Sequence, residues 1–574
     1  MKVSLTTLIA FFWSVSSLHA QDIAGQYLQK WQLFYPTDAA RAGLRTAIFD
    51  YEDRSKRAID QWVTFNREVL AIVSDTGAMF TKEQTIDARL LRVQAQSEID
   101  RWHLLRTHEK DVSLYLRLLS NAIPSVKAAA HLTAPEKAQL ICKRLMSLTQ
   151  LSQAGQANLS SATKNQIEDS QDKFEALIAD LDALPEALKA SGILMDCEGF
   201  EENLTIAKSS VRHLYDFVVE TLSKSIVPTS DILGKDEYAR QLALYTDSEL
   251  TPETLAEMAL KEIQMVRGLM EKVSVAYLQK TYPYESLPDT FEARLAKALR
   301  DMEKDVPLNS SDYEQFWNEL SEKAISFVKE KGLGTLPEHQ TLSIQSAPES
   351  AGPAARIGWV GSAPPFDPNP WTTLYLPSIP NTLPEKEQRD FWSSFNKPFN
   401  RIIVIHELFP GHYMQLKISR ETAHPIRLLF PYGTYIEGWA TFCERLALDE
   451  GWDDGNEMTM LAHLRKRIEN ANRAYTSVQV HTRGWTQDQV MNFSTETSLV
   501  APQFAKSLWF RLMRSPMQLT SYFLGSTQFS DLYAAEKERL GSQFDLKLFM
   551  DTIMKSGPIP IDEFQEIFAR TIPR

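Results

Sequence analysis

Two histidines and two carboxylates in the second half of the chain have the chemistry needed to hold a catalytic metal ion. His406 and His412 lie six residues apart, Glu407 directly follows the first histidine, and Glu437 lies one predicted helix further along. Two imidazoles and a carboxylate can bind Zn²⁺ and leave one coordination position open for water. A second carboxylate beside a ligand can take a proton from that water. The pattern predicts His406, His412 and Glu437 as zinc ligands and Glu407 as the general base.

The spacing of the two histidines does not fit a regular helix. Six residues rotate a side chain by about 600° and advance it about 9 Å, so the two imidazoles would point about 120° apart. Pro410 cannot donate a hydrogen bond to the carbonyl of His406, and Gly411 tolerates unusual torsion angles. We therefore expect the helix to break or bulge at Pro410 and Gly411, so that both imidazoles can reach one metal ion.

Two carboxylates compete for the position of third ligand. Glu437 is the better candidate, and Glu444 lies seven residues further on, nearly on the same helix face. A carboxylate at that distance suits a partner that orients a ligand histidine by a hydrogen bond. The reverse assignment, with Glu444 as the ligand, stays open. Gly438, beside Glu437, would permit close packing of this helix against another.

The elements that position these residues are predicted to be mostly α-helices. Apolar residues recur at three-to-four spacing along most of the chain, and Thr251, Pro252 and Glu253 form a typical helix start. The cluster is expected on helices within 387–419 and 433–449. Other expected helices cover 85–120, 135–152, 164–190, 200–222, 252–279, 290–304, 455–483, 486–496, 501–512, 515–540 and 545–555.

A proline-rich segment between about residues 332 and 384 interrupts the helical pattern. Short β-like runs lie within it at 341–344, 355–360 and 372–376. We expect a small sheet just before the metal-binding helix, in a large, mainly α fold with a deep cleft. The sheet edge could hold an extended peptide by main-chain hydrogen bonds, or the sheet could simply brace the helices.

Length and charge exclude some functions and favour others. The 574 residues can bury a large core, and a formal net charge of −13 argues against a nucleic-acid partner. Residues 1–20 are typical of a signal peptide, with an apolar run at 8–15 and cleavage expected after Ala20, although an uncleaved anchor stays open. No later segment is long and apolar enough to cross a bilayer. We expect an exported protein, periplasmic or secreted, without stable membrane insertion.

The mature chain is expected to contain two helical regions and few disulfides. Residues 21–235 would form an N-terminal region and 236–574 a catalytic region, in one continuous fold. Three cysteines exclude a disulfide scaffold. In an exported protein Cys142 could pair with Cys197, while Cys443 lies in a helical apolar pattern and is expected in the core.

Several motifs together resemble the bacterial domain-of-unknown-function family number 885. That family is placed among the zincin-like metallopeptidases of the Glu-zincin type, and the resemblance covers most of the chain from about Gln21. The motifs are His406-Glu407-x-x-Pro410-Gly411-His412-x-x-Gln415, Glu437-Gly438-Trp439-Ala440-x-x-x-Glu444, His481-x-x-Gly484-Trp485 and Pro516-x-Gln518-x-x-x-Tyr522-x-x-Gly525.

The resemblance implies roles for further residues beside the metal ligands. Gln415 would lie near the site and help to bind substrate. His481 and Tyr522 would donate hydrogen bonds to a substrate carbonyl or to the oxyanion of the tetrahedral intermediate. Arg473 could hold a substrate carboxylate through its two parallel N–H groups.

Two positions depart from the family pattern. Ser477 stands where an acid is expected, which puts the orientation of His481 in doubt. Met550 stands where a histidine is expected, which would remove a polar group from the cleft. Both departures suggest altered specificity or weakened catalysis.

The sequence favours a zinc-dependent hydrolase that acts on short peptides, with a carboxypeptidase as the first expectation because Arg473 could bind a terminal carboxylate. One alternative is a non-catalytic, zinc-containing peptide-binding protein. Another is a hydrolase of a non-peptide amide or ester. The same ligands also suit Mn, Co and Fe, and the oligomeric state stays open.

Overall fold

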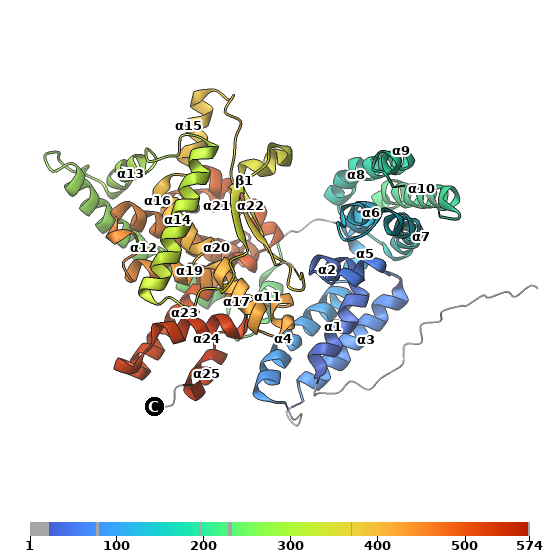
Figure 1. The fold of residues 1–574 in the computed structure, drawn as a ribbon, viewed down its shortest axis with the longest axis horizontal. Coiled ribbons are helices and arrows are strands. Elements are labelled where there is room, and N and C mark those ends of the chain that lie inside the picture. The colour runs from blue at the N-terminus through green and yellow to red at the C-terminus, as the bar shows by residue number, and fades with distance from the viewer. Residues whose placement is uncertain (1–21, 76–79, 194–196, 228–231, 369, 572–574) are drawn as a thin grey trace, which may run out of the picture.

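Helices dominate the fold, as the sequence predicts (Figure 1). The computed structural model describes residues 22–75, 80–193, 197–227, 232–368 and 370–571, so the expected signal peptide lies outside the described residues. The helices of the N-terminal part are α1 (Ile23–Phe34), α2 (Pro36–Arg41), α3 (Lys56–Val73), α4 (Lys82–Ile99), α5 (Thr107–Lys110), α6 (Val112–Ala128), α7 (Ala134–Asn158), α8 (Lys164–Asp182), α9 (Leu184–Ala190) and α10 (Phe200–Asp216).

The remaining helices form the larger body, which carries the predicted metal ligands. Those before and around the metal motif are α11 (Lys235–Thr246), α12 (Pro252–Thr281), α13 (Phe291–Met302), α14 (Ser310–Lys331), α15 (Glu385–Ser393), α16 (Lys397–Glu407), α17 (His412–Thr422) and α18 (Pro425–Leu429). Those that follow are α19 (Tyr435–Asp449), α20 (Glu457–Arg483), α21 (Gln487–Asn492), α22 (Pro502–Arg514), α23 (Gln518–Leu540), α24 (Leu546–Ser556) and α25 (Glu563–Thr571).

Two long predicted helices are divided in the structure. The helix expected at 85–120 is α4, α5 and α6, because Asp111 starts α6 afresh by accepting a hydrogen bond from the backbone N–H of Ser113. The helix expected at 164–190 ends at Asp182, and Pro185 occupies the first turn of α9. Apolar spacing alone did not reveal these breaks, because it continues across them.

The predicted sheet is present and small. Its strands are β1 (Leu342–Ser346), β2 (Trp359–Gly361) and β3 (Thr372–Leu376), with β3 in the centre, parallel to β1 and antiparallel to β2. The strand expected at 355–360 was too long, because residues Glu349–Arg356 form 3₁₀ turns. Figure 1 shows the sheet beside α14, against which β1 packs. The binding of an extended peptide along the edge of this sheet stays a prediction.

The buried side chains form two large clusters. One is formed mostly by residues between Ile23 and Leu222, and the other mostly by residues between Tyr238 and Phe568, which include the helices of the metal motif. The clusters are tied together, because Ile86 from α4 belongs to the second cluster and Ile426 from α18 to the first. The division into regions 21–235 and 236–574 stays a prediction.

Charged side chains and a disulfide add to this packing. The guanidinium of Arg427, on α18, donates to Asp87 and Glu83 of α4 at 2.6 Å each, which joins the two parts of the chain. Cys142 and Cys197 form a disulfide, and Cys443 is fully buried in the core, as the sequence indicated.

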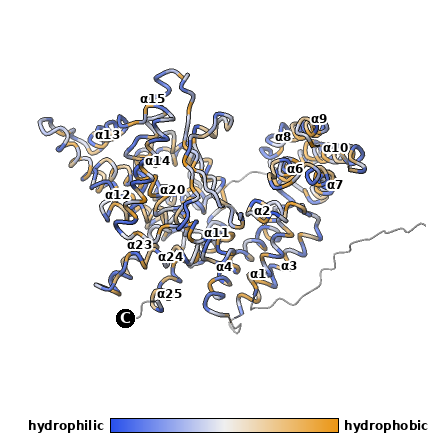
Figure 2. The backbone as a smooth tube through the Cα atoms, viewed as in Figure 1, coloured by the Kyte–Doolittle hydropathy of each residue, from blue (hydrophilic) through white to orange (hydrophobic). Residues whose placement is uncertain are grey.

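The helices are amphipathic, and in Figure 2 orange and blue stretches alternate along them. None of the helices among the described residues is both long and apolar enough to cross a membrane.

Candidate metal centre

The helix that carries His406 breaks where the sequence predicts it. Helix α16 ends at Glu407 and α17 begins at His412, with Gly411 at φ −70° and ψ −140°. A Cβ atom at Gly411 would overlap the backbone oxygens of Ile405 and His406, so only glycine fits this turn. The Trp439 indole N–H donates to the carbonyl oxygen of Pro410 at 3.0 Å, which ties the break to α19.

The break brings the three predicted ligands together. Nε2 of His406 and Nε2 of His412 lie 3.6 and 3.3 Å from the same oxygen, Oε2 of Glu437. One ligand atom from each residue lies within 4.8 Å of the others. Two ligands of a tetrahedral zinc ion, each about 2.1 Å from the metal, stand about 3.4 Å apart. The donor set and its separations therefore fit a single zinc ion.

Helix packing places Glu437 opposite the histidines. Gly438 of α19 and Gly525 of α23 face each other so closely that a Cβ atom on either would overlap the other. A Cβ at Gly525 would also overlap the carbonyl oxygen of Thr434. The close packing expected at Gly438 is confirmed, and it fixes the first turn of the helix that carries Glu437.

Glu444 holds the far side of the His406 ring. It is fully buried, and its Oε1 accepts from Nδ1 of His406 at 2.8 Å, while Nε2 of that ring faces Glu437. Nδ1 of His406 must carry a proton in this network, because a carboxylate can only accept. Glu444 thus orients the ring rather than joining the cluster, and the geometry favours Glu437 over Glu444 as the ligand.

Two more partners of Glu444 come from α20, and sequence reasoning missed both. Nδ1 of His463 donates to Oε2 of Glu444 at 3.1 Å, and Nζ of Lys466 lies 2.7 Å from Oε1. Burial raises the pKa of Glu444, but Lys466 and the two histidines outweigh it and hold that pKa well below its usual value. The three-residue spacing of His463 and Lys466 places both side chains on one face of a helix, but nothing in the sequence linked that face to Glu444.

Contacts within the cluster also shift the pKa values of Glu437 and His406. Burial raises the pKa of Glu437, but hydrogen bonds from His406 and His412 hold it well below the usual range. Burial and the charge of Lys466 lower the pKa of His406, while its bonds to Glu437 and Glu444 raise it, with a net rise to about 9. Glu437 is therefore ionised at neutral pH and available as a ligand.

A cavity of about 430 Å³ opens beside His406 and Glu407. Tyr522 and Arg473 line it as well, and the Arg473 guanidinium lies 4.9 Å from the centre of the Tyr522 ring. The Gln518 amide connects Tyr522 to the cluster, because it lies 3.1 Å from the Tyr522 hydroxyl and 3.5 Å from Oε1 of Glu437. Tyr522 and Arg473 therefore belong to the same site as the predicted ligands and base.

Two predicted site residues lie elsewhere. His481 is buried against Tyr238, with Nδ1 accepting from the backbone N–H of Leu233 and Nε2 bonded to the carbonyl of Leu512. The geometry does not support the expected contact of His481 with substrate, because both ring nitrogens are engaged by backbone groups. Gln415 follows the ligand His412 on α17, but it is fully buried and does not line the cavity.

Comparison with known proteins assigns the chain to a family. The family model described as "Bacterial protein of unknown function (DUF885)" matches residues 36–567. The chain belongs to this family. No curated protein matches the chain.

Solved structures of similar proteins show the same fold. A candidate lipoprotein of unknown function from Shewanella oneidensis has a TM-score of 0.82 and 20% identity, covering 95% of this chain and 98% of that one. A candidate lipoprotein from Colwellia psychrerythraea has a TM-score of 0.67 and 18% identity, covering 96% and 99%. At identities this low the likeness shows the fold alone, and the chemistry is argued from the site.

The two departures from the DUF885 pattern lie outside the cavity lining. Ser477 is fully buried, where its hydroxyl accepts from Tyr238 and donates to the carbonyl of Pro516. Met550 is fully buried within the larger core cluster. The expected loss of a polar group from the cleft at Met550 is not what the structure shows, because an apolar side chain there packs in the core.

Proposed function

We propose that this protein is a zinc-dependent hydrolase of short peptides with a zincin-like mechanism. The supporting observation is the convergence of His406, His412 and Glu437 on one point, beside a cavity that Glu407 lines. Glu444 adds to this support, because a buried carboxylate on the far ring nitrogen is a recurring feature of zinc-binding histidines.

The residues around the cavity have separate tasks in the hydrolysis. A bound Zn²⁺ supplies a Lewis acid that polarises a carbonyl and acidifies a coordinated water. Glu407 accepts the proton of the attacking water and transfers it to the leaving amine as the C–N bond breaks. Tyr522 donates its hydroxyl hydrogen bond to the oxyanion that forms on the carbonyl oxygen.

The basic residues of the cavity favour substrates with a free carboxyl terminus. Arg473 is already engaged, because its guanidinium donates to Glu469 and Asn470. Arg465 and Arg511 line the same cavity, and neither forms an ion pair with a carboxylate among the described residues. An arginine without an ion-pair partner in a cleft attracts an anionic group. We therefore assign recognition of a terminal carboxylate to Arg465 and Arg511, with Arg473 in a supporting position.

An exported location completes the proposal. The N-terminal sequence is typical of a signal peptide, and both solved structures of the same fold belong to candidate lipoproteins. Short peptides in the periplasm or outside the cell are then the accessible substrates.

Metal content measured together with activity tests this proposal. The mature wild type, Glu407→Gln and the control Glu387→Gln, an exposed residue on α15, are analysed by elemental mass spectrometry and incubated with a mixed peptide library. We expect about one zinc ion in all three proteins, with cleavage by the wild type and the control only. Zinc without cleavage by any of them would favour a non-catalytic peptide-binding protein or a non-peptide amide or ester substrate. Absence of bound metal would overturn the proposal.

A further inference from the structure

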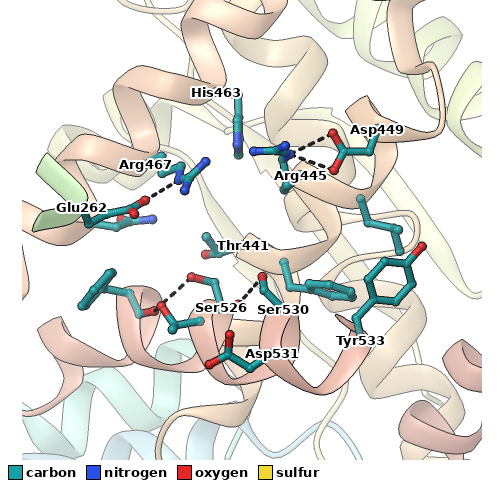
Figure 3. Close-up of a pocket in the computed structure, with 15 residues that line it drawn as sticks. Glu262, Thr441, Arg445, Asp449, His463, Arg467, Ser526, Ser530, Asp531 and Tyr533 are labelled. Carbon is teal, nitrogen blue, oxygen red and sulfur yellow. Dashed lines mark hydrogen bonds and ion pairs between the residues drawn. The ribbon is translucent and has the colours of Figure 1, made fainter. Parts of the chain in front are cut away.

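A second cavity, of about 370 Å³, lies between α19, α20 and α23 (Figure 3). It shares only Asn470 with the lining of the metal cavity. Its volume is within the range of small-molecule binding sites, about 300–1000 Å³. None of the motifs that point to the metal centre accounts for it.

Three residues that line this cavity carry buried polar atoms without hydrogen-bond partners. Nε2 of His463, Oγ1 of Thr441 and Nδ2 of Asn470 are inaccessible to solvent and have no hydrogen-bond partner within the described part of the chain. All three residues line the cavity, and each is at most 5% exposed. Buried polar groups in native proteins are nearly always satisfied, so three such atoms around one space indicate a polar occupant.

The orientation of two of these side chains is fixed from behind. His463 uses Nδ1 to hold Glu444, and therefore Nε2 is the ring nitrogen that is left without a partner. Asn470 accepts from Arg473 through Oδ1 at 3.0 Å, which leaves its amide N–H₂ as a donor. These polar groups are preorganised rather than free to turn away.

The charged residues are arranged at opposite sides of the space. In Figure 3, Arg445, Arg467 and His463 lie along one side, and Ser526, Ser530 and Asp531 along the other.

Each arginine pairs through its Nε edge, Arg445 with Asp449 and Arg467 with Glu262. A guanidinium has five N–H donors, so its terminal groups remain available to a ligand. Asp531 has no ion-pair or hydrogen-bond partner among the described residues.

Apolar side chains complete the lining. Phe442, Leu446, Phe523 and Tyr533 border the same cavity. A ligand held here meets cationic donors on one side, a carboxylate on the other and aromatic surface between them.

We propose that this cavity is a binding site for a zwitterionic amino acid or dipeptide with an apolar side chain. The ligand's carboxylate accepts from the terminal N–H groups of Arg445 and Arg467 and from the Asn470 amide. Its ammonium group faces Asp531, and its side chain packs against Phe442 and Phe523. The proposal does not depend on hydrolysis at the metal centre, because the two cavities share only Asn470 in their linings.

Binding of L-leucine to the full mature chain, loaded with zinc, tests the proposal by isothermal titration calorimetry. L-leucinamide and N-acetyl-L-leucine serve as probes that each lack one of the two charges. We expect saturable binding of leucine. Each blocked probe should bind at least about tenfold more weakly, because it loses a charge-assisted contact. Equal binding of all three probes, or no saturable leucine binding, would overturn the proposal.

Substitutions in each of the two cavities show which cavity binds leucine. Asp531→Asn changes an exposed side chain without a described partner, so the fold should be preserved, and Arg445→Gln removes a half-exposed guanidinium that would contact the ligand's carboxylate. Both should weaken leucine binding about tenfold, whereas Arg511→Gln in the metal cavity should leave it unchanged. Thermal unfolding of each variant checks folding. Loss of binding in Arg511→Gln with normal binding in Asp531→Asn would place leucine in the metal cavity and refute the inference.

Discussion

Nδ1 of His406 and Oε1 of Glu444 lie 2.8 Å apart although 38 residues separate them in the chain. This bond joins α16 to α19 behind the predicted metal ligands. It fixes which nitrogen of His406 faces Glu437, and therefore which lone pair a metal ion can use.

Replacing Glu444 should weaken metal binding without removing a ligand. In Glu444→Gln the amide cannot accept from His406, His463 and Lys466 as the carboxylate does, so His406 loses its fixed tautomer. We expect zinc affinity to fall by about 10-fold to 100-fold, measured by competition with a chromophoric chelator. Glu450→Gln, at the end of the same helix, is the matched control and should bind zinc normally. Equal affinity of Glu444→Gln and the wild type would contradict the orienting role.

The turn between the two histidines should not tolerate a side chain. In Gly411→Ala the added Cβ would overlap the backbone oxygen of His406, so the break must rearrange and separate the imidazoles. We expect loss of stoichiometric zinc by elemental analysis and a lower melting temperature.

Gly268 provides the control for this change. It lies within α12 with open space around a Cβ atom, so Gly268→Ala should retain zinc and be stabilised by up to about 1 kcal/mol. If Gly411→Ala retained full zinc affinity, the requirement for glycine would be disproved.

Zinc binding should release a proton near neutral pH. The pKa of His406 is raised to about 9 in the metal-free protein, so its ring is protonated at pH 7.5 and must lose a proton before Nε2 can bind a metal. The raised pKa means that zinc affinity should increase with pH up to about 9 and then level off.

Calorimetric titrations in two buffers of different ionisation enthalpy measure this release. We expect about one proton from His406 for each zinc ion bound at pH 7.5. Identical binding enthalpies in the two buffers would show that no net proton is released.

Arg511 should contribute to substrate recognition, although none of the sequence motifs includes it. In a Glu407→Gln background, which prevents turnover, Arg511→Gln should weaken the binding of peptides with a free carboxyl terminus by about tenfold. Peptides with an amidated terminus should be affected much less. Fluorescence anisotropy of labelled peptide pairs measures the difference, and Lys506→Gln, on the same helix but outside the cavity lining, is the control. An equal effect on both peptides would rule out carboxylate recognition by Arg511.

The sequence predicted the parts of the site that depend on local chemistry. The break at Pro410 and Gly411 followed from the missing N–H and the freedom of glycine, and Glu444 as an orienting partner followed from helix periodicity. His463 and Lys466 could not be predicted, because they meet Glu444 only through the packing of α19 against α20. The backbone partners of His481 could not be predicted for the same reason, since the motif does not show that Leu233 and Leu512 contact its ring.

The main features of the fold were also predicted from the sequence. Helical periodicity and proline content gave the mainly α architecture and the position of the small sheet. Helix breaks at Asp111 and Pro185 were missed because apolar spacing continues through them. The start of β2 was placed too early, because Ile357 lies just before Trp359 and Val360 and makes the run look like a longer strand.

Glu444 is a buried charge shared by three basic side chains, and this sharing limits how the family can change. Losing any one of His406, His463 or Lys466 leaves an ionised carboxylate short of a partner in the core, which is costly. Replacement of the carboxylate would likewise leave the partly buried Lys466 without its counter-charge. We expect His406, Glu444, His463 and Lys466 to be retained together in the family. Relatives in which one of them is replaced should have replaced the other three as well.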